Sequence, residues 1–342
     1  MTTEKAQPNT KTGETRAAAE EPQRQAQGIE TSDSFFRSPK YLSVSAQLHL
    51  EALSQSVGNV WTLSPTFRAE KSDTSRHMAE FYMLEAEMSF VDDMTVLMDL
   101  VEDMLRYLAV RLRQDTSIYD EILDASGSRV MEKHMLSSAE EVRARWDGMT
   151  SKPWPRIRYT DAIKLLKEEE GCFEHKVEWG LPLQAEHERF LAQKVSSREG
   201  SCDPTPVFVT HYPRDIKAFY MLESPSADDQ GFMIPEPGPT VACFDLLVPD
   251  LCEIVGGSMR EHRRDQLLVN MERNGLVSSQ LSHSGRRKTD GPLDWYADLR
   301  RWGSPPHGGF GLGFDRLLAY LTGVQNVKDV VAFPRWWGRC DC

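Results

Sequence analysis

The stretch FRAEKSDTSRHMAEFYMLEAEMSF, residues 67–90, places a highly charged loop between two runs of alternating apolar and polar residues. The first run begins upstream at Trp61, and the second ends at Phe90. Because successive side chains of a β-strand point to opposite faces, a period of two predicts a strand on each side of the loop. The stretch therefore predicts a hairpin.

The alternation gives each predicted strand one apolar and one polar face. Trp61, Leu63 and Phe67 share a face of the first strand, and Tyr82 and Leu84 share a face of the second. We expect these apolar faces to lie in the core. The opposite face collects Ser64, Thr66, Arg68, Glu70, Phe81, Met83, Glu85 and Glu87.

The polar face has the groups that a nucleoside triphosphate requires. A guanidinium binds phosphate, an aromatic ring stacks on a base, and carboxylates hold magnesium or an exocyclic amine. A solvated sheet face with cross-strand ion pairs would have the same composition. The alternation alone does not decide between the two interpretations.

A second segment, PPHGGFGLGFDRLLAYLTG at residues 305–323, changes abruptly from a glycine-rich run to a helical pattern with Asp315 and Arg316 in its first turn. Glycines let a backbone approach a ligand closely, and the start of a helix attracts phosphate. The segment matches neither GxxxxGK[ST] nor GxGxxG, which weakens the P-loop and Rossmann interpretations.

A third segment, FDLLVPDLCEIVGGSMREH at residues 244–262, places Asp245 and Glu253 in apolar surroundings and Arg260 after two glycines. Buried carboxylates are costly unless they are paired or bind a metal. A structural ion pair and a magnesium site therefore both stay open.

Composition argues against several classes of protein. A net charge of −12 argues against broad electrostatic binding to nucleic acid or anionic membranes. No apolar run reaches the roughly 18 residues that span a bilayer. The six cysteines lack CxxC spacing, which is typical of reduced thiols. The N-terminal residues resemble neither a secretory signal nor a transit peptide, which favours a cytoplasmic location.

Residues 1–34 contain almost no large apolar residue, so we expect them to be disordered. Residues 35–342 alternate strand and helix patterns, as expected for one domain, and the longest helical pattern covers residues 92–112. Surface insertions are expected near residues 114–155, 196–206 and 222–240. The first insertion is expected to carry one short helix that begins with a Ser-x-x-Glu capping box.

Taken in order, these segments resemble the class II aminoacyl-tRNA synthetases, and within them the asparaginyl branch of the bacterial or organellar type. Residues 67–90 are similar to the family's motif 2, and residues 308–335 to its motif 3. Four more segments are similar to asparaginyl segments: YLSVSAQLHLEAL, VEWGLPLQAEHERFL, YPRDIKAFYM and DLLVPDLCEIVGGSMRE. The resemblance covers residues 35–340 and implies an α+β fold in which helices flank an antiparallel β-sheet.

The resemblance implies an ATP site made of Arg68, Glu70, Arg76, His77, Phe81 and Arg316. In that family Arg68 would bind the α-phosphate, Glu70 the adenine amino group, and Phe81 would stack on adenine. Arg316 would hold the γ-phosphate, so that the two arginines of motifs 2 and 3 are the implied catalytic residues. The two remaining members of the set would lie over the pyrophosphate on a mobile loop.

The implied amino-acid site consists of Gln47, Lys217, Tyr220 and Arg260. Gln47 would help to hold the amino acid, and Arg260 would contact its side chain. Leu50 stands where aspartyl relatives carry a lysine, which favours a neutral amide over a carboxylate. The implied cofactors are ATP and Mg²⁺, and the implied metal ligands are Asp245 and Glu253.

The implied reaction activates asparagine, or a related amino acid, to the aminoacyl-adenylate and transfers it to tRNA(Asn). The amino acid carboxylate attacks the α-phosphorus without a protein nucleophile. Family members also carry an N-terminal anticodon-binding OB-fold and a motif 1 that builds a homodimer interface. The sequence matches neither, so we expect both to be missing. The resemblance also leaves a mitochondrial location open.

Two other functions stay open beside the ligase. A repurposed paralogue would use the adenylate to form an amide or a small metabolite without tRNA. A non-catalytic paralogue would bind a nucleotide or a partner. The presence of both implied phosphate-binding arginines, Arg68 and Arg316, favours an enzyme.

Overall fold

The computed structural model describes residues 35–36, 40–127, 137–151, 153–196, 205–225, 236–277 and 293–340. The chain divides into two compact units, residues 1–42 and 43–342, and the second contains nearly all the described residues. The disorder expected for residues 1–34 falls outside the described residues, as do most of the insertions expected near residues 196–206 and 222–240.

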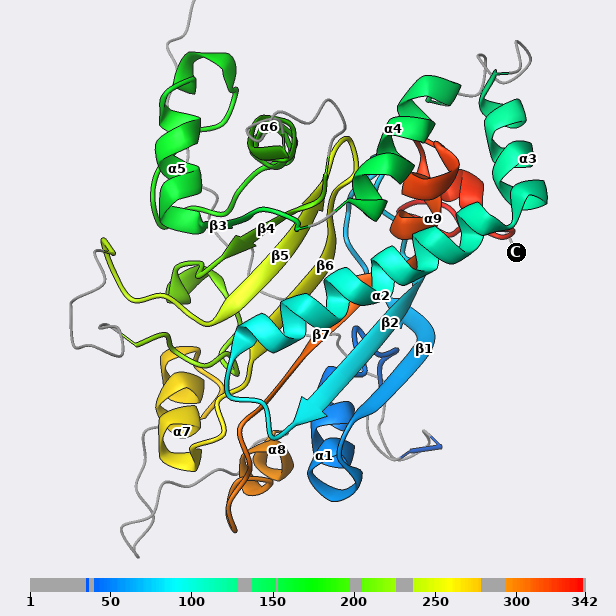
Figure 1. The fold of residues 1–342 in the computed structure, drawn as a ribbon. Coiled ribbons are helices and arrows are strands. Elements are labelled where there is room, and N and C mark those ends of the chain that lie inside the picture. The colour runs from blue at the N-terminus through cyan, green and yellow to red at the C-terminus, as the bar shows by residue number, and fades with distance from the viewer. Residues whose placement is uncertain are drawn as a thin grey trace, which may run out of the picture. The chain divides into compact units, whose positions relative to one another are not determined.

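A seven-stranded sheet forms the centre of the second unit (Figure 1). Its strands are β1 (Val60–Phe67), β2 (Glu80–Ser89), β3 (Arg156–Arg158), β4 (Val207–Thr210), β5 (Cys243–Val248), β6 (Cys252–Met259) and β7 (His307–Gly313). They lie in the order β1-β2-β7-β6-β5-β4-β3, and only β3 and β4 pair in parallel. The glycine-rich β7 therefore lies between the charged hairpin and β6. The predicted α+β class with an antiparallel sheet is confirmed.

Helices cover both faces of this sheet. The described α-helices are α1 (Gln47–Val57), α2 (Met94–Gln114), α3 (Thr116–Gly127), α4 (Ala139–Thr150), α5 (Tyr159–Lys167), α6 (Ala185–Ser196), α7 (Arg264–Arg273), α8 (Asp294–Asp298) and α9 (Phe314–Thr322). Short 3-10 helices are η2 (Glu170–Cys172), η4 (Arg214–Ile216) and η5 (Val327–Val330). The long α2 crosses the front of the sheet in Figure 1 and shares one core with α4, α9 and the central strands. None of the described helices is long and apolar enough to cross a bilayer.

The hairpin of β1 and β2 forms as predicted, but the expected core face of β1 is wrong. Trp61 and Leu63 are 72% and 44% exposed, whereas Glu85 and Glu87 on the polar face are buried. The polar face is covered by the start of α1, where Ser45 Oγ donates to Glu85 at 2.5 Å. On the apolar face, α9 packs against β2, and α2 packs against β7 and β6. The apolar residues of β2 are therefore partly buried, but β1 lies at the edge of the sheet.

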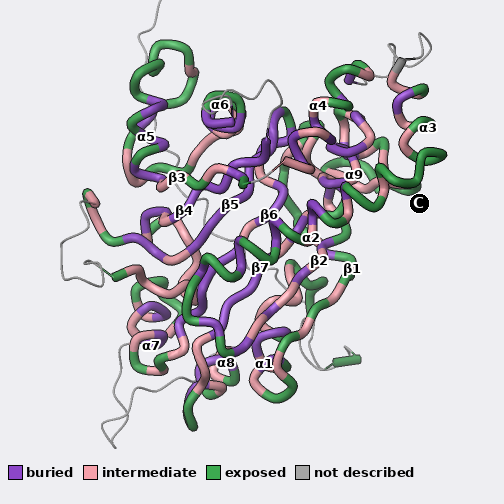
Figure 2. The backbone as a smooth tube through the Cα atoms, in the orientation of Figure 1, coloured by how far each residue is buried: buried purple, intermediate pink, exposed green. Residues whose placement is uncertain are grey.

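The segment near residues 114–155 also differs from its prediction as a surface insertion with one short helix. Its described residues form two helices, α3 and α4, and α4 contributes to the main core (Figure 2). The capping box is confirmed, because Ser138 and Glu141 exchange side-chain-to-backbone hydrogen bonds of 2.7 and 3.2 Å. Val142 and Trp146 lie four residues apart on one face of α4 and are fully buried. The apolar stripe of α4 packs against α2, α3 and α9, so this helix is not a surface insertion.

Trp146→Ala is expected to destabilise the fold strongly. The buried ring packs edge-on against Tyr119, and its Nε1 donates to the carbonyl of Leu321 at 2.8 Å. Removing it leaves a cavity and an unpaired carbonyl, so the free energy of unfolding should fall by about 3–5 kcal/mol. Trp302 is 88% exposed, so Trp302→Ala should change stability by less than about 0.5 kcal/mol. Urea unfolding followed by circular dichroism measures both, and equal losses would contradict the prediction.

Candidate active site

A cavity of about 630 Å³ opens over β2, β6 and β7. It is bordered by the loop of residues 68–79, by α1 and by the segment of residues 217–221. The structure brings all the residues singled out from the sequence to this cavity. They are Gln47, Arg68, Glu70, Arg76, His77, Phe81, Lys217, Tyr220, Asp245, Glu253, Arg260 and Arg316. The three sequence segments therefore form one site.

Two arginines and one aromatic ring form the first part of this site. The guanidinium of Arg68 lies over the ring of Phe81, with its carbon 5.2 Å from the ring centroid. Arg316 comes from the first turn of α9, and its Nη1 donates to the carbonyl of Glu253 at 2.7 Å. The neighbouring Asp315 accepts a hydrogen bond of 2.7 Å from the backbone N–H of Tyr82. This bond joins α9 to β2 and fixes the position from which Arg316 extends.

The loop of residues 68–79 brings further charged groups to the cavity. The Nη1 atom of Arg76 lies 3.8 Å from the carboxylate of Glu188, at the start of α6. His77 Nε2 lies 3.7 Å from Glu70, and its Nδ1 hydrogen-bonds to Thr74 at 2.6 Å. Partial burial and the charge of nearby arginine side chains lower the pKa of His77, which favours the neutral imidazole at pH 7.

The carboxylates of Asp245 on β5 and Glu253 on β6 border the same space. A Cβ atom added to Gly256 would lie 2.9 Å from Glu253 Oε1 and 3.6 Å from Asp245 Oδ1. Burial raises the pKa of Glu253, and the charge of Asp245 raises it further. Lys217 Nζ donates to Asp245 Oδ2 at 2.7 Å. Asp245 therefore forms the ion pair that the sequence left open as one of two interpretations.

The acidic pair offers a candidate pair of ligands for a divalent ion. No group of three or more His, Cys, Asp and Glu side chains in the described ranges could hold a metal by itself. Two carboxylates beside an open space are sufficient for Mg²⁺ when phosphate oxygens and water complete the shell. The donor set therefore fits a magnesium ion that arrives with a nucleotide.

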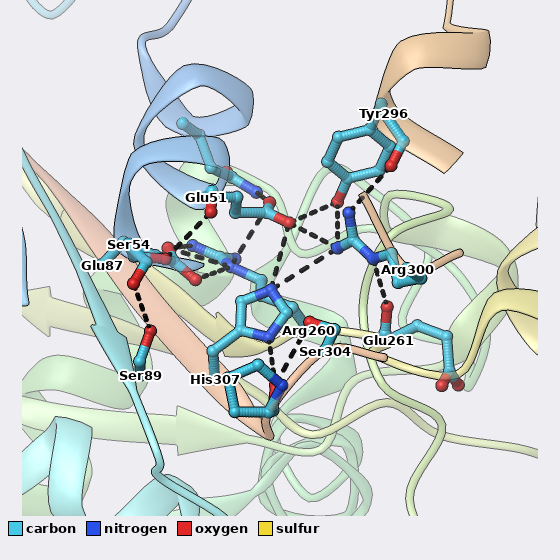
Figure 3. Close-up of polar contacts among 12 residues, drawn as sticks. Glu51, Ser54, Glu87, Ser89, Arg260, Glu261, Tyr296, Arg300, Ser304 and His307 are labelled. Carbon is cyan, nitrogen blue, oxygen red and sulfur yellow. Dashed lines mark hydrogen bonds and ion pairs between the residues drawn. The ribbon is translucent and has the colours of Figure 1, made fainter. Parts of the chain in front are cut away.

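Arg260 lines the cavity and is held from behind by Glu87 (Figure 3). Its Nε and Nη2 atoms donate to the Glu87 carboxylate at 3.0–3.3 Å, and its Nη1 donates to Ser258 Oγ at 2.5 Å. Arg260 is 3% exposed and Glu87 1%. Burial raises the pKa of Glu87, although the charge of Arg260 opposes the shift. The guanidinium thus reaches the cavity with its charge largely balanced.

Glu51 lies behind this pair and joins it to two more elements (Figure 3). Its fully buried carboxylate accepts hydrogen bonds of 2.6 Å from both Arg300 and Tyr296, lies 3.4 Å from His307 Nε2, and is 3.9 Å from Arg260. Burial alone would raise the pKa of Glu51, but the hydrogen bond from His307 and the two guanidinium charges outweigh it and lower the pKa to about 2. We call Glu51, Glu87, Arg260, Arg300, Tyr296 and His307 the Glu51 network.

Two carboxylates near the site were not assigned from the sequence. Glu51 is fully buried, follows Gln47 by one turn of α1 and accepts a hydrogen bond of 3.1 Å from its amide. Glu188 reaches the site from α6. Burial and the charges of Glu253 and Asp245 raise the pKa of Glu188 to about 7.

The antiparallel sheet and the arginine-lined cavity point to a class of protein. The chain belongs to the family described as tRNA synthetases class II (D, K and N), whose model matches residues 8–337. This result confirms the resemblance that motifs 2 and 3 indicated.

Within the family, similar proteins carry the asparaginyl name. The chain is 42% identical to the mitochondrial asparagine–tRNA ligase of Saccharomyces cerevisiae over 89% of its length, and 41% identical to the asparagine–tRNA ligase of Nostoc over 92%. The crystal structure of asparaginyl-tRNA synthetase from Pyrococcus horikoshii, complexed with asparaginyl-adenylate, matches with a TM-score of 0.67 and 33% identity over 88% of this chain. The chain spans 58–59% of the length of these three relatives.

Glu51→Gln is expected to destabilise the protein in a pH-dependent way. The variant keeps the shape of the side chain but leaves Arg260 and Arg300 with one buried carboxylate fewer, so unfolding should become easier by about 3–5 kcal/mol at pH 7. The folded-state pKa of about 2 lies below the ordinary value of 4.5, so the stabilisation is present above pH 4.5 and is lost as pH falls toward 2.

Urea unfolding at several pH values measures this difference between wild type and variant. The difference in the free energy of unfolding between wild type and Glu51→Gln should be constant above about pH 5 and become smaller below it. Glu140 is exposed on α4, so Glu140→Gln should show no such trend. A difference in the free energy of unfolding that grows as the pH falls would contradict the prediction.

Proposed function

We propose that the protein activates asparagine with ATP to form the aminoacyl-adenylate and transfers it to tRNA(Asn). The observation that carries the proposal is that the phosphate-binding arginines Arg68 and Arg316 share one cavity with Arg260 and Gln47. The names of the relatives and the adenylate in the Pyrococcus horikoshii complex support it. They also favour the ligase over a repurposed or a non-catalytic paralogue.

The nucleotide occupies the part of the cavity lined by motifs 2 and 3. Arg68 binds the α-phosphate, Arg316 the γ-phosphate, and Phe81 stacks on adenine, whose amino group donates to Glu70. Arg68 leaves its place over the Phe81 ring when adenine arrives. The loop residues Arg76 and His77 then lie over the departing pyrophosphate. The hydrogen bond from Arg316 to the Glu253 carbonyl supports this assignment, because it holds one guanidinium ready before the nucleotide binds.

Asparagine binds beside the α-phosphate, and its carboxylate attacks the α-phosphorus in line. No protein nucleophile takes part. The protein accelerates the step by holding both reactants and by placing positive charge where negative charge develops. Lys217 is held close to Asp245 by its ion pair, which supports a role at the amino-acid end of this arrangement.

Asparagine is preferred over aspartate because of how charge is balanced near Arg260. The Glu87 carboxylate binds the guanidinium of Arg260 through two nitrogens, and Leu50 adds an apolar wall. A carboxylate side chain would meet no uncompensated cation there, whereas an amide forms hydrogen bonds without a charge to bury. Gln47 and Tyr220 complete this end of the cavity.

Asp245 and Glu253 would hold Mg²⁺ together with phosphate oxygens of ATP. When bound, the ion neutralises phosphate charge and orients the triphosphate. The raised pKa of Glu253 supports this assignment, because a buried carboxylate beside a second one is stabilised by an arriving cation. Lys217 then holds the remaining oxygen of Asp245 and fixes its orientation.

We extend the proposal to the macromolecular partners. The tRNA is the acceptor of the activated amino acid, and a second copy of the chain is the proposed protein partner. The exposed apolar face of the hairpin supports a protein contact, because Trp61, Leu63 and Tyr82 are 72%, 44% and 46% exposed on paired strands.

Amino-acid-dependent exchange of pyrophosphate into ATP tests the first step. Run with all twenty amino acids, the exchange should be specific to asparagine. Arg68→Ala or Arg316→Ala should each lower it by roughly 10²–10³-fold, because each removes a charge that stabilises the transition state. Arg111 lies on the surface of α2, so Arg111→Ala should leave exchange unchanged. Exchange that survives in both active-site variants would refute the assigned phosphate site.

Leu50→Lys tests the amino-acid preference. An ammonium at this buried position, which is 6% exposed, would restore an uncompensated positive charge beside Arg260. Exchange with asparagine should fall, and the ratio of aspartate to asparagine exchange should rise by at least roughly tenfold. Leu50→Met conserves volume without charge and should keep the asparagine preference. A ratio that does not rise would show that charge balance does not set the preference.

A further inference from the structure

A second cavity, of about 550 Å³, lies on the other side of the loop of residues 68–79. It is lined by Asp73 from that loop, by Lys328 of η5, and by the aromatic segment, which we define as residues 333–339. Within this segment Phe333 and Trp337 are 68% and 57% exposed. The proposed activation step uses no residue of this cavity.

The two cavities share a wall only one residue thick. Val327 lines the first cavity, whereas its neighbours Asn326 and Lys328 line the second. Two backbone hydrogen bonds fix the loop to this wall, from Val327 N to Ser75 O at 2.9 Å and from Ala79 N to Arg335 O at 2.7 Å. The two cavities are therefore close neighbours on the two sides of this wall.

The chemistry of the second cavity suits unpaired nucleotides. Lys328 Nζ lies 4.8 Å from the centroid of the Trp336 ring, and the guanidinium carbon of Arg339 lies 4.9 Å from it. Aromatic rings and arginine planes are the surfaces on which single-stranded bases stack. The carboxylates of Asp73 and Asp329 balance the two cations. Stacking, and not net positive charge, would therefore provide the affinity.

We propose that the second cavity binds the unpaired 3′ nucleotides of the tRNA acceptor end, with Trp336 and Arg339 as the stacking surface. This inference rests on the proposed function, in which a terminal hydroxyl of tRNA must reach the adenylate in the first cavity. The exposed rings of Phe333 and Trp337 extend the surface outward.

Fluorescence anisotropy with labelled hairpin RNA tests the inference. One hairpin ends in an unpaired 3′ CCA, and the other is the same duplex with a blunt end. The full chain should bind the overhang between about fivefold and 150-fold more tightly per stacked base. Because the cavity carries balanced charge, the ratio of the two affinities should change little between about 50 and 200 mM salt, although both affinities fall.

Substitutions in the aromatic segment locate the effect. Trp336→Ala should abolish the preference for the overhang, Trp336→Phe should keep most of it, and Arg339→Ala should reduce it severalfold. Trp302 is the matched control, since it is an exposed tryptophan with Arg301 5.1 Å from its ring centroid, and Trp302→Ala should keep the full preference. Pyrophosphate exchange by each variant verifies that the first cavity is intact.

The outcomes separate the two proposals. A wild-type chain with no overhang preference, or a preference that survives in both Trp336→Ala and Arg339→Ala, overturns the inference whether or not exchange occurs. An overhang preference that depends on Trp336, in a protein without exchange for any amino acid, supports the inference and refutes the proposed activation. If Trp336→Ala does not fold, the overhang preferences of Trp336→Phe and Arg339→Ala are compared instead. A preference that Trp336→Phe keeps and Arg339→Ala reduces supports the inference, and an undiminished preference in both overturns it.

Discussion

The buried charges of the Glu51 network hold together parts of the chain that are 173 to 256 residues apart. Glu51 on α1 binds Tyr296 of α8 and Arg300 just after it, and Glu87 on β2 binds Arg260 after β6. A buried charge without a partner costs several kcal/mol, so each member requires the others. The network therefore fixes α1, β2, β6 and the segment before β7 relative to one another. The first cavity has its shape because these elements meet there.

The same network explains why the predicted core face of the hairpin was wrong on β1. The period of two was right, and it separated polar from apolar residues correctly on both strands. The period of two does not indicate which face of the hairpin another helix will cover. Glu85 and Glu87 are buried because α1 supplies their partners, and Trp61 is exposed because α2 and α9 lie over the inner strands. Burial of a polar face depends on partners distant in sequence, and these are invisible to a local pattern.

The residues assigned to the site come from segments far apart in the sequence, yet all of them line the first cavity. They could be named in advance because the resemblance to the family assigns a position in the sequence to each of them. Glu188 was not assigned, since α6 looks like an ordinary amphipathic helix and only the fold brings its first turn to Arg76. The core role of Trp146 was missed for a related reason. A polar helix with one apolar stripe gives no information on which surface will receive that stripe.

One glycine of β7 has a different cause from the one that the sequence indicated. The glycines of this segment are predicted to let the backbone approach a ligand closely, and Gly311 and Gly313 do line the first cavity. A Cβ atom at Gly309 would lie 2.1 Å from Glu87 Oε2 and 2.2 Å from the carbonyl of Ala86, so this position must be glycine to admit the carboxylate that holds Arg260. Across the sheet, a Cβ at Gly257 would lie 2.3 Å from the ring of Phe244. At Gly309 the missing side chain makes room for a buried carboxylate, whereas Gly256 leaves open the space between Asp245 and Glu253. Glycines of β6 and β7 thus serve two purposes, the access of a ligand at Gly256 and the packing of a buried ion pair at Gly309, and only the neighbours of each residue distinguish them.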